Sequence, residues 1–201
     1  MSRVRRFTVI VAISSVWLWM EAASMPAVAE VRLPHIFGDN MVLQRDLPVP
    51  VWGWAEPGED VTVEIKDLQT QAKSDVSGRW RTTLPAISAG GPFELRVTGK
   101  NSLRLTNVLV GEVWICSGQS NMAWPVSKAV KADEEIKAAT LSNIRLFTVP
   151  MKTAGVPTSD IEAKWDICSP ATVGDFSAVG YFFGRELHRK TDIPIGLIDT
   201  S

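Results

Sequence analysis

The sequence has few of the residues on which many active sites depend. It contains two histidines, two cysteines and one tyrosine among 201 residues. No cluster of His, Cys and carboxylate residues has the spacing of a metal site, and no glycine-rich loop of the phosphate-binding kind is present. We therefore expect neither a metal ion nor a cofactor. The formal net charge of −1 provides no basic surface for nucleic acid.

Long apolar runs are absent after the first thirty residues, so no later segment is predicted to cross a membrane. Near the start, three arginines precede the apolar run Phe7–Met20, and Ala27-Val28-Ala29 is a small-x-small cleavage signal. The run is shorter than the roughly 20 residues that span a bilayer. We therefore predict a signal peptide over residues 1–29, cleaved after Ala29, and a secreted or periplasmic product.

Export permits a disulfide, and Cys116 and Cys168 are the two cysteines available. Cys116 lies in an apolar segment where a small thiol packs well, and a chain of this length can be stable on its core alone. We predict two buried free thiols rather than a bridge.

Residues 30–107 have the pattern of an all-β domain. Apolar and other residues alternate with period two in several short segments, which are separated by turn residues such as Glu56-Pro57-Gly58-Glu59. The predicted strands are 49–54, 61–65, 79–84 and 93–97. Short strands at this spacing predict a β-sandwich.

The pattern changes at about residue 108. Strand-like segments at 108–115, 144–149 and 193–198 alternate with helices predicted over about 127–140 and 176–189. This order predicts an α/β domain over 108–201 with a parallel sheet. Ser127 and Asp175 are the predicted N-caps. The predicted buried face of the second helix consists of residues 176, 179, 182, 183 and 187.

The turn after the first of these strands is the most informative segment. The apolar run Val108–Ile115 is followed by Cys116-Ser-Gly-Gln-Ser-Asn-Met122, and an α/β fold presents its site at such a turn. Ser120 has the position of a nucleophile, which needs a base to take its proton. The alternative is a tight turn that uses Gly118 and Asn121 for backbone reasons. Residue 122 is Met, so this is not the Gly-x-Ser-x-Gly elbow.

Neither histidine has a sequence context that predicts the base. His35 is near the start of the predicted mature chain and is interpreted as a structural residue of the opening loop. His188 is near the end of the second predicted helix, where the helix dipole favours it, and is interpreted as a solvated helix-end residue.

The segment Val110–Met122 resembles the signature of the sialate O-acetylesterase family, a branch of the SGNH hydrolases. Segments 37–45, 49–55 and 176–187 also resemble family segments in the same order, so the similarity covers most of residues 31–201. The resemblance implies an SGNH-type, flavodoxin-like hydrolase fold after residue 108. It also implies a secreted, cofactor-independent esterase that removes O-linked acetyl groups from sialic acid or related sugars.

The resemblance further implies that Ser120 forms an acyl-serine intermediate and that its backbone N–H helps to hold the oxyanion. Gly118, Gln119 and Asn121 would support the turn, and Trp124 is the best candidate for a wall of the substrate pocket. Later family blocks, which supply a Gly, an Asn and an Asp-x-x-His, have no counterpart in this sequence. We therefore interpret the chain as the N-terminal portion of such an esterase, inactive by itself because serine and base act as one unit.

Other interpretations stay open. The same scaffold would suit a deacetylase of acetylxylan or another plant polysaccharide. The chain would alternatively be a non-catalytic carbohydrate-binding β-sandwich with a vestigial hydrolase segment. The exposure of Trp52 and Trp54, which face the same side of one strand, distinguishes the sugar-binding interpretation from the others. We expect them in the core, whereas their exposure would favour sugar binding. A last possibility is an unstable fragment whose sheet has an unpaired strand.

Overall fold

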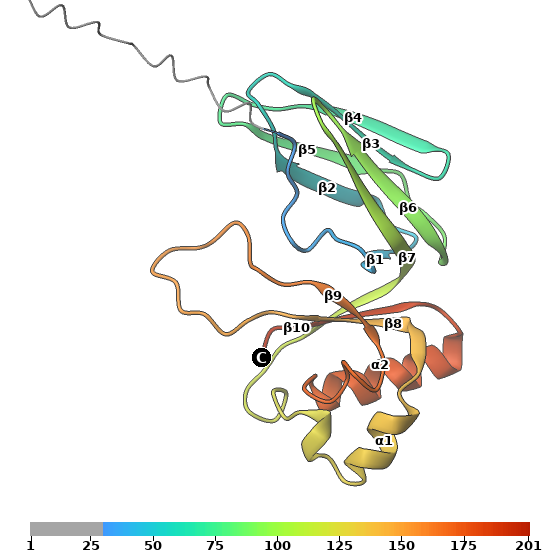
Figure 1. The fold of residues 1–201 in the computed structure, drawn as a ribbon. Coiled ribbons are helices and arrows are strands. Elements are labelled where there is room, and N and C mark those ends of the chain that lie inside the picture. Colours follow the sequence, from blue (N-terminus) through green and yellow to red (C-terminus); the bar gives the residue numbers. More distant parts are fainter. Residues whose placement is uncertain (1–29) are drawn as a thin grey trace, which may run out of the picture.

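The computed structural model describes residues 30–201, so the predicted signal peptide lies outside the described residues (Figure 1). The strands are β1 (Val42–Gln44), β2 (Val49–Trp54), β3 (Asp60–Ile65), β4 (Leu68–Lys73), β5 (Arg79–Leu84), β6 (Gly90–Thr98), β7 (Ser102–Cys116), β8 (Leu141–Thr148), β9 (Trp165–Cys168) and β10 (Ile195–Asp199). The helices are η1 (Val126–Lys128), a 3-10 helix, α1 (Ala132–Ala138) and α2 (Ala178–Thr191). In this part of the chain, no helix has the length and apolar character needed to cross a membrane.

Strand β7 runs through both regions of the molecule (Figure 1). Its first part pairs antiparallel with β6, while residues 109–111 pair parallel with β1 and residues 112–116 pair parallel with β10. The strand order β4-β3-β6-β7-β10-β8-β9 therefore continues from the all-β region into the α/β region as one mixed sheet of eight strands, including β1. The predicted boundary between residues 107 and 108 falls inside β7, and the division into domains stays a prediction.

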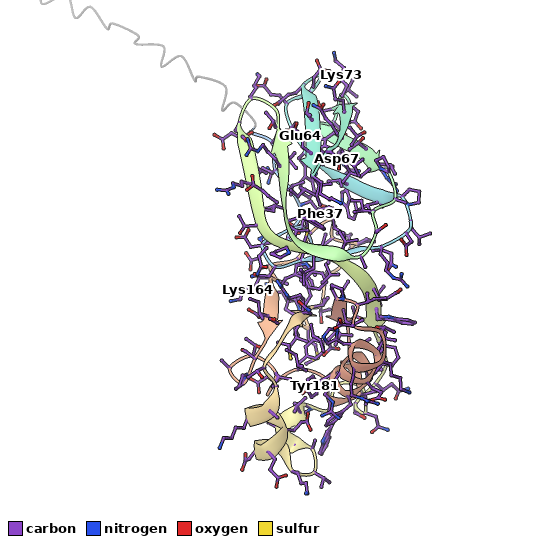
Figure 2. The ribbon with its side chains drawn as sticks, turned by 90° about the vertical axis from the view of Figure 1, so that its right-hand side faces the viewer. Phe37, Glu64, Asp67, Lys73, Lys164 and Tyr181 are labelled. Carbon is purple, nitrogen blue, oxygen red and sulfur yellow. The ribbon has the colours of Figure 1, made fainter. Side chains whose placement is uncertain are left out.

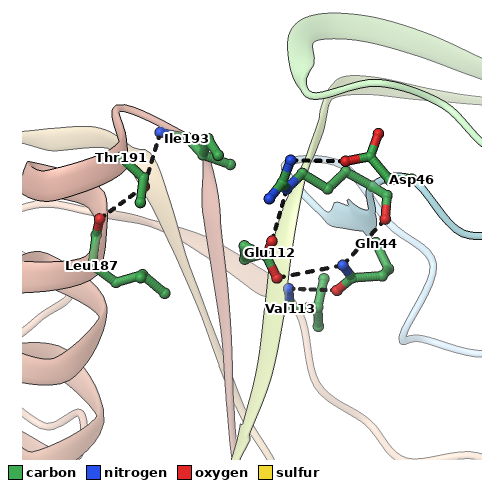
Figure 3. A network of polar contacts seen from close by, with 8 residues as sticks. Gln44, Asp46, Glu112, Val113, Leu187, Thr191 and Ile193 are labelled. Carbon is green, nitrogen blue, oxygen red and sulfur yellow. Dashed lines mark hydrogen bonds and ion pairs between the residues drawn. The ribbon is translucent and has the colours of Figure 1, made fainter.

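Polar side chains fix β1 against β7 at the point where β7 changes its partners (Figure 3). Arg45 donates from Nε to Glu112 at 2.7 Å and from Nη1 to Asp46 at 2.7 Å. Gln44 Oε1 accepts from the backbone N–H of Val113 at 3.0 Å. Val113 lies just beyond the last β1–β7 pair, so the glutamine side chain satisfies a donor that β1 no longer reaches.

Strands β2 and β5 form a second, two-stranded sheet that shares a core with the large one. Val51 and Leu84 from the small sheet and Val63 and Val97 from the large sheet are fully buried in one cluster. The four strands predicted from alternation are thus present as β2, β3, β5 and β6. A separate β-sandwich is not confirmed, because β3, β4 and β6 belong to the same sheet as the parallel strands.

The tryptophans of β2 lie outside this core, contrary to our expectation. Trp52 is 38% exposed and Trp54 is partly exposed, whereas Val51 and Gly53 point inward. The indole of Trp80, from β5, occupies the inner space: a Cβ at Gly53 would lie 3.0 Å from Trp80 Cζ2. Because that space is filled, the two tryptophans of β2 are on the outer face of the small sheet.

The strands β7, β10 and β8 are parallel, as the alternation of elements predicts. The last strand, β10, lies between the other two, so both of its edges are paired. Strand β9 is antiparallel to β8 and lies between the predicted strand 144–149 and the predicted helix 176–189, where no strand was predicted. Its presence makes the sheet mixed rather than parallel.

The two faces of the parallel strands are covered by different parts of the chain. Helices cover one face, where Leu197 packs in a cluster with Tyr181. The other face meets the all-β region, because Phe147 and Trp165 belong to the core of that region, and Trp165 Nε1 donates to Ile36 O at 2.8 Å. Figure 2 shows Tyr181 in the lower, helical part and Phe37 in the upper part. Both faces are covered over β8 and β10, as parallel strands require, whereas Trp114 and Ile115 of β7 are 43% and 70% exposed.

Helix α2 packs only in part through the predicted face, because Phe176 is buried and Phe182 and Leu187 pack against the core, whereas the other two predicted residues are exposed. Val179 and Phe183 are 48% and 43% exposed, whereas Tyr181 and Gly184 are buried. A Cβ at Gly184 would lie 2.7 Å from Leu197 Cδ1. The small residue at 184 therefore brings the helix close to the sheet, and Val179 and Phe183 lie at the margin of the contact.

Both predicted N-caps are wrong. Ser177 caps α2, since its Oγ accepts from the Gly180 N–H at 3.1 Å, while Asp175 is exposed. The segment after Ser127 is η1 and then a separate short helix, α1, with Lys131 at its N-cap. The Ser127 N–H donates to Gly174 O at 2.9 Å, which ties this segment to the loop before α2.

Candidate active site

The segment Ser117–Met122 follows the carboxyl end of β7. Cys116, the last residue of β7, pairs with Asp199, the last residue of β10. The Thr200 N–H then donates to Cys116 O at 2.9 Å. The carboxyl ends of parallel strands meet at one edge of a sheet, where α/β folds place their ligands, so the segment has the position of an active-site turn.

Ser120 and Asn121 are the central residues of a tight turn. The turn is closed by the Met122 N–H, which donates to Gln119 O at 2.8 Å. Gly118 permits a close approach, since a Cβ there would lie 3.1 Å from Met122 Cβ. The residues predicted to support the turn, Gly118, Gln119 and Asn121, thus all lie in it or directly before it. Gly118 is needed for the close contact with Met122 and has no positive φ angle.

The turn lines an open hollow of about 530 Å³, formed by residues 117–122 and Val179. Ser120 is exposed. Within residues 30–201, the backbone N–H groups of residues 118–121 have no hydrogen-bond acceptor. An exposed hydroxyl beside unused N–H donors is the arrangement that acyl transfer needs, because the donors can hold an oxyanion.

Helix α2 supports the turn from behind through Ser177, which the sequence analysis missed. Its buried Oγ donates to Met122 O at 2.6 Å while accepting from the Gly180 N–H. The Ala178 N–H donates to Trp124 O at 2.8 Å. The sequence signal that could have identified Ser177 is its place directly before the helical run, where N-cap residues usually lie.

Trp124 is 50% exposed and is not among the residues that line the hollow. Its Nε1 donates to Lys128 O at 3.1 Å, and Lys128 Nζ lies 5.6 Å from the ring centroid. These contacts hold the indole against η1. Its role as a pocket wall stays a prediction.

In the described part of the chain, the lining of the hollow includes no histidine or carboxylate. His188 is half-buried rather than solvated, and its Nδ1 donates to Ile193 O at 2.8 Å. His35 Nδ1 lies 2.8 Å from Asp160 Oδ2, and its backbone N–H donates to Asp160 Oδ1 at 2.8 Å. Burial would raise the pKa of Asp160, but the hydrogen bonds from His35 outweigh it and lower the pKa. His35 is therefore a structural residue, as predicted.

Comparisons with known proteins place these observations in a family. No family model matches the chain. The sialate O-acetylesterases of Mus musculus and Homo sapiens are each 31% identical to it, over 85% of this chain and 35% and 36% of the relatives. A solved carbohydrate acetylesterase from Xanthomonas citri is 40% identical, with a TM-score of 0.82, over 85% of this chain and 40% of that chain. Over most of its length, the chain is similar to members of the sialate O-acetylesterase family.

The chain spans about a third of the length of the curated sialate O-acetylesterases that it matches. The mixed sheet with few helices is consistent with a hydrolase-like domain, as in the Xanthomonas citri acetylesterase. The resemblance of several segments to this family is therefore confirmed, while the role of each site residue stays a prediction.

A buried carboxylate that the sequence analysis did not select lies at the same end of the sheet. Asp199 is 7% exposed, and its Oδ1 accepts from the Ser201 N–H at 3.1 Å and from Ser201 Oγ at 2.7 Å. Burial raises the pKa of the Cys116 thiol, and the charge of Asp199 raises it further. The sequence signal that could have identified it is an Asp directly after the apolar run 195–198.

Cys116 and Cys168 are buried free thiols, which confirms the prediction. Burial raises the pKa of Cys168 to about 12, so neither thiol has the character of a nucleophile. Among residues 30–201, no group of three or more His, Cys, Asp and Glu side chains is placed to hold a metal ion.

Proposed function

We propose that this chain presents Ser120 as the nucleophile of an exported esterase that removes O-acetyl groups from sialic acid or a related sugar. The observation that carries the proposal is the exposed Ser120 at the centre of the Gln119–Met122 turn, at the carboxyl end of β7 and in an open hollow. The similar proteins are sialate and carbohydrate acetylesterases, which supports an acetyl ester as the substrate.

In the proposed reaction, Ser120 Oγ attacks the carbonyl carbon of the acetyl group and its proton passes to a base. The N–H groups of the turn hold the oxyanion. The bond between the carbonyl carbon and the sugar oxygen then breaks, and that oxygen takes the proton. Water hydrolyses the acyl-serine and releases acetate. The described residues that line the hollow supply no base, so we expect slow turnover by this chain alone.

A second candidate substrate is an acetylated plant polysaccharide such as acetylxylan. The observation that favours it is the higher identity to the carbohydrate acetylesterase, 40%, than to the Mus musculus sialate O-acetylesterase, 31%. Acetate release from 9-O-acetylated sialic acid and from acetylxylan, measured side by side, decides between the two substrates.

The assignment of Ser120 as the nucleophile is tested by replacing it and, as a control, Ser117 of the same hollow. The chain, Ser120→Ala and Ser117→Ala are treated with p-nitrophenyl acetate and, separately, with a serine-directed phosphonate followed by intact-mass measurement. Both serines are exposed and line the hollow, so neither substitution should change the fold. We expect Ser117→Ala to keep both the p-nitrophenol release and the phosphonate adduct and Ser120→Ala to lose both. Rates and adducts that exceed the background without protein and are equal for the two variants would refute the proposal.

A further inference from the structure

The outer face of the small sheet carries two tryptophans and three arginines. Trp52 and Trp54 of β2 are cross-strand partners of Arg81 and Arg79 of β5. Arg32 is bridged to Trp54 through its backbone. We name these five residues the Trp–Arg face. Residues two apart in a strand, and their direct partners, share one side of the sheet, so the five side chains form one surface.

A groove of about 620 Å³ follows this surface. The loop before β9 contributes to one of its walls. Its lining consists of Pro50, Trp52, Gly53, Trp54, Arg79, Trp80, Arg81 and Ser159. The groove is therefore built mainly by β2 and β5, whereas the Ser120 hollow is built by the segment after β7 and by Val179 of α2.

Contacts below and beside the rings fix their positions. The Phe37 ring packs edge-on against Trp52, with centroids 4.7 Å apart and planes at 75°. Figure 2 labels Phe37 within the upper part of the molecule. The Arg32 guanidinium carbon lies 5.3 Å from the centroid of Trp54. Rings that are fixed before binding lose little entropy when a ligand stacks on them.

The charge of this face is positive and unpaired. In the described part of the chain, Arg32, Arg79 and Arg81 form no ion pair, and no carboxylate lines the groove. Asp75 is a nearby carboxylate in the turn before β5. It accepts a hydrogen bond from the backbone N–H of Arg79 at 2.9 Å rather than from the Arg79 guanidinium. Two guanidinium groups on β5 are therefore free to bind an anion.

We propose that the Trp–Arg face binds a carboxylated sugar. The apolar face of the sugar ring stacks on the exposed indole of Trp52 and the partly exposed indole of Trp54. Its carboxylate takes charge-assisted hydrogen bonds from Arg79 and Arg81. A neutral sugar would leave the arginines unused, and a simple anion would leave the indoles unused. The inference does not rest on the chemistry of Ser120, because the two sites share no residue.

The test compares N-acetylneuraminic acid with its methyl ester, which lacks the negative charge. The purified chain is labelled with ¹⁵N, and the indole N–H signals are followed by NMR during titration. We expect the acid to shift the Trp52 and Trp54 signals to saturation and the ester to bind about tenfold more weakly, since a hydrogen bond to a charged group is lost. Trp→Phe variants assign the two signals.

Variants then locate the charge. Arg79→Gln/Arg81→Gln should weaken binding of the acid to the level of the ester, while Arg104→Gln, an exposed arginine on β7, should change nothing. Ser120→Ala should bind as the unmodified chain does. Equal affinities for acid and ester would overturn the proposal without the need for any variant. So would equal shifts of the same signals by inorganic tripolyphosphate, which would mean a general anion surface, or shifts confined to other tryptophans.

Discussion

The Ser177 hydroxyl donates a hydrogen bond to Met122 O at 2.6 Å and accepts one from the Gly180 N–H at 3.1 Å. One buried side chain thus joins the end of the Ser120 turn to the first turn of α2. The position of the proposed nucleophile therefore depends on how α2 is capped and where it packs.

Replacing this residue should cost stability. Ser177→Ala removes the N-cap and leaves the Met122 carbonyl without its donor, and we expect a loss of about 2 kcal/mol. Urea unfolding followed by tryptophan fluorescence measures it. Ser127→Ala is the matched control, because that serine is exposed and its side chain caps no helix; it should change stability by less than about 0.5 kcal/mol. Identical midpoints for both variants would contradict the role of Ser177.

The sequence predicted the parts of the fold that depend on local pattern. Alternation located β2, β3, β5 and β6. The change from the apolar run of β7 to a polar, Gly-containing segment located the turn with Ser120. The two thiols were also predicted correctly, because a chain of this size needs no bridge.

The features that were missed depend on contacts between distant segments. The buried face of α2 is set by Gly184 against Leu197, and a count of apolar residues selects Val179 and Phe183 instead. The exposure of Trp52 follows from the indole of Trp80, which fills the space inside the sheet. Strand β9 is short, and its pairing with β8 has no periodic signal.

The close approach of α2 to the sheet makes Gly184 sensitive to any side chain. A Cβ there would lie 2.7 Å from Leu197 Cδ1 and 2.9 Å from Cδ2. Alanine improves helix propensity by about 1 kcal/mol, but overpacking costs about 1 to 3 kcal/mol, so Gly184→Ala should destabilise the protein by about 1 kcal/mol. Gly155→Ala, where nothing lies within 4 Å of the added Cβ, should leave the urea midpoint unchanged or slightly higher. A stabilised Gly184→Ala would mean that α2 is free to move away.

Both thiols should be inert in the folded protein. Burial raises the pKa of Cys116 and raises that of Cys168 to about 12, and the thiolate is the reactive form. We expect Ellman's reagent to detect no thiol at pH 8 in the native state and both after addition of urea without reductant. Reaction of either cysteine before unfolding would contradict the burial. Absence of a reaction with Ellman's reagent after unfolding would indicate a disulfide.

Glu135 should make stability depend on pH. It accepts from Tyr181 Oη at 2.9 Å and pairs with Arg185, which attaches α1, a helix with no buried residue, to α2. Burial would raise the pKa of Glu135, but the bonds from Arg185 and Tyr181 outweigh it and hold the pKa below its ordinary value of 4.5.

The folded state therefore binds this proton less tightly than the unfolded state, so the contribution is complete above pH 4.5 and is lost as the pH falls through the lowered pKa. Glu135→Gln should lower the free energy of unfolding by about 1 kcal/mol at pH 7. The effect is modest because Arg185 is 39% exposed, so that solvent screens its ion pair with Glu135. The difference from the unmodified chain should shrink at pH 3.5. Glu134 is an exposed neighbour on the same helix, and Glu134→Gln should leave the urea unfolding midpoint unchanged at both pH values. A difference that is constant between pH 7 and pH 3.5 would show that the charge of Glu135 does not hold α1 in place.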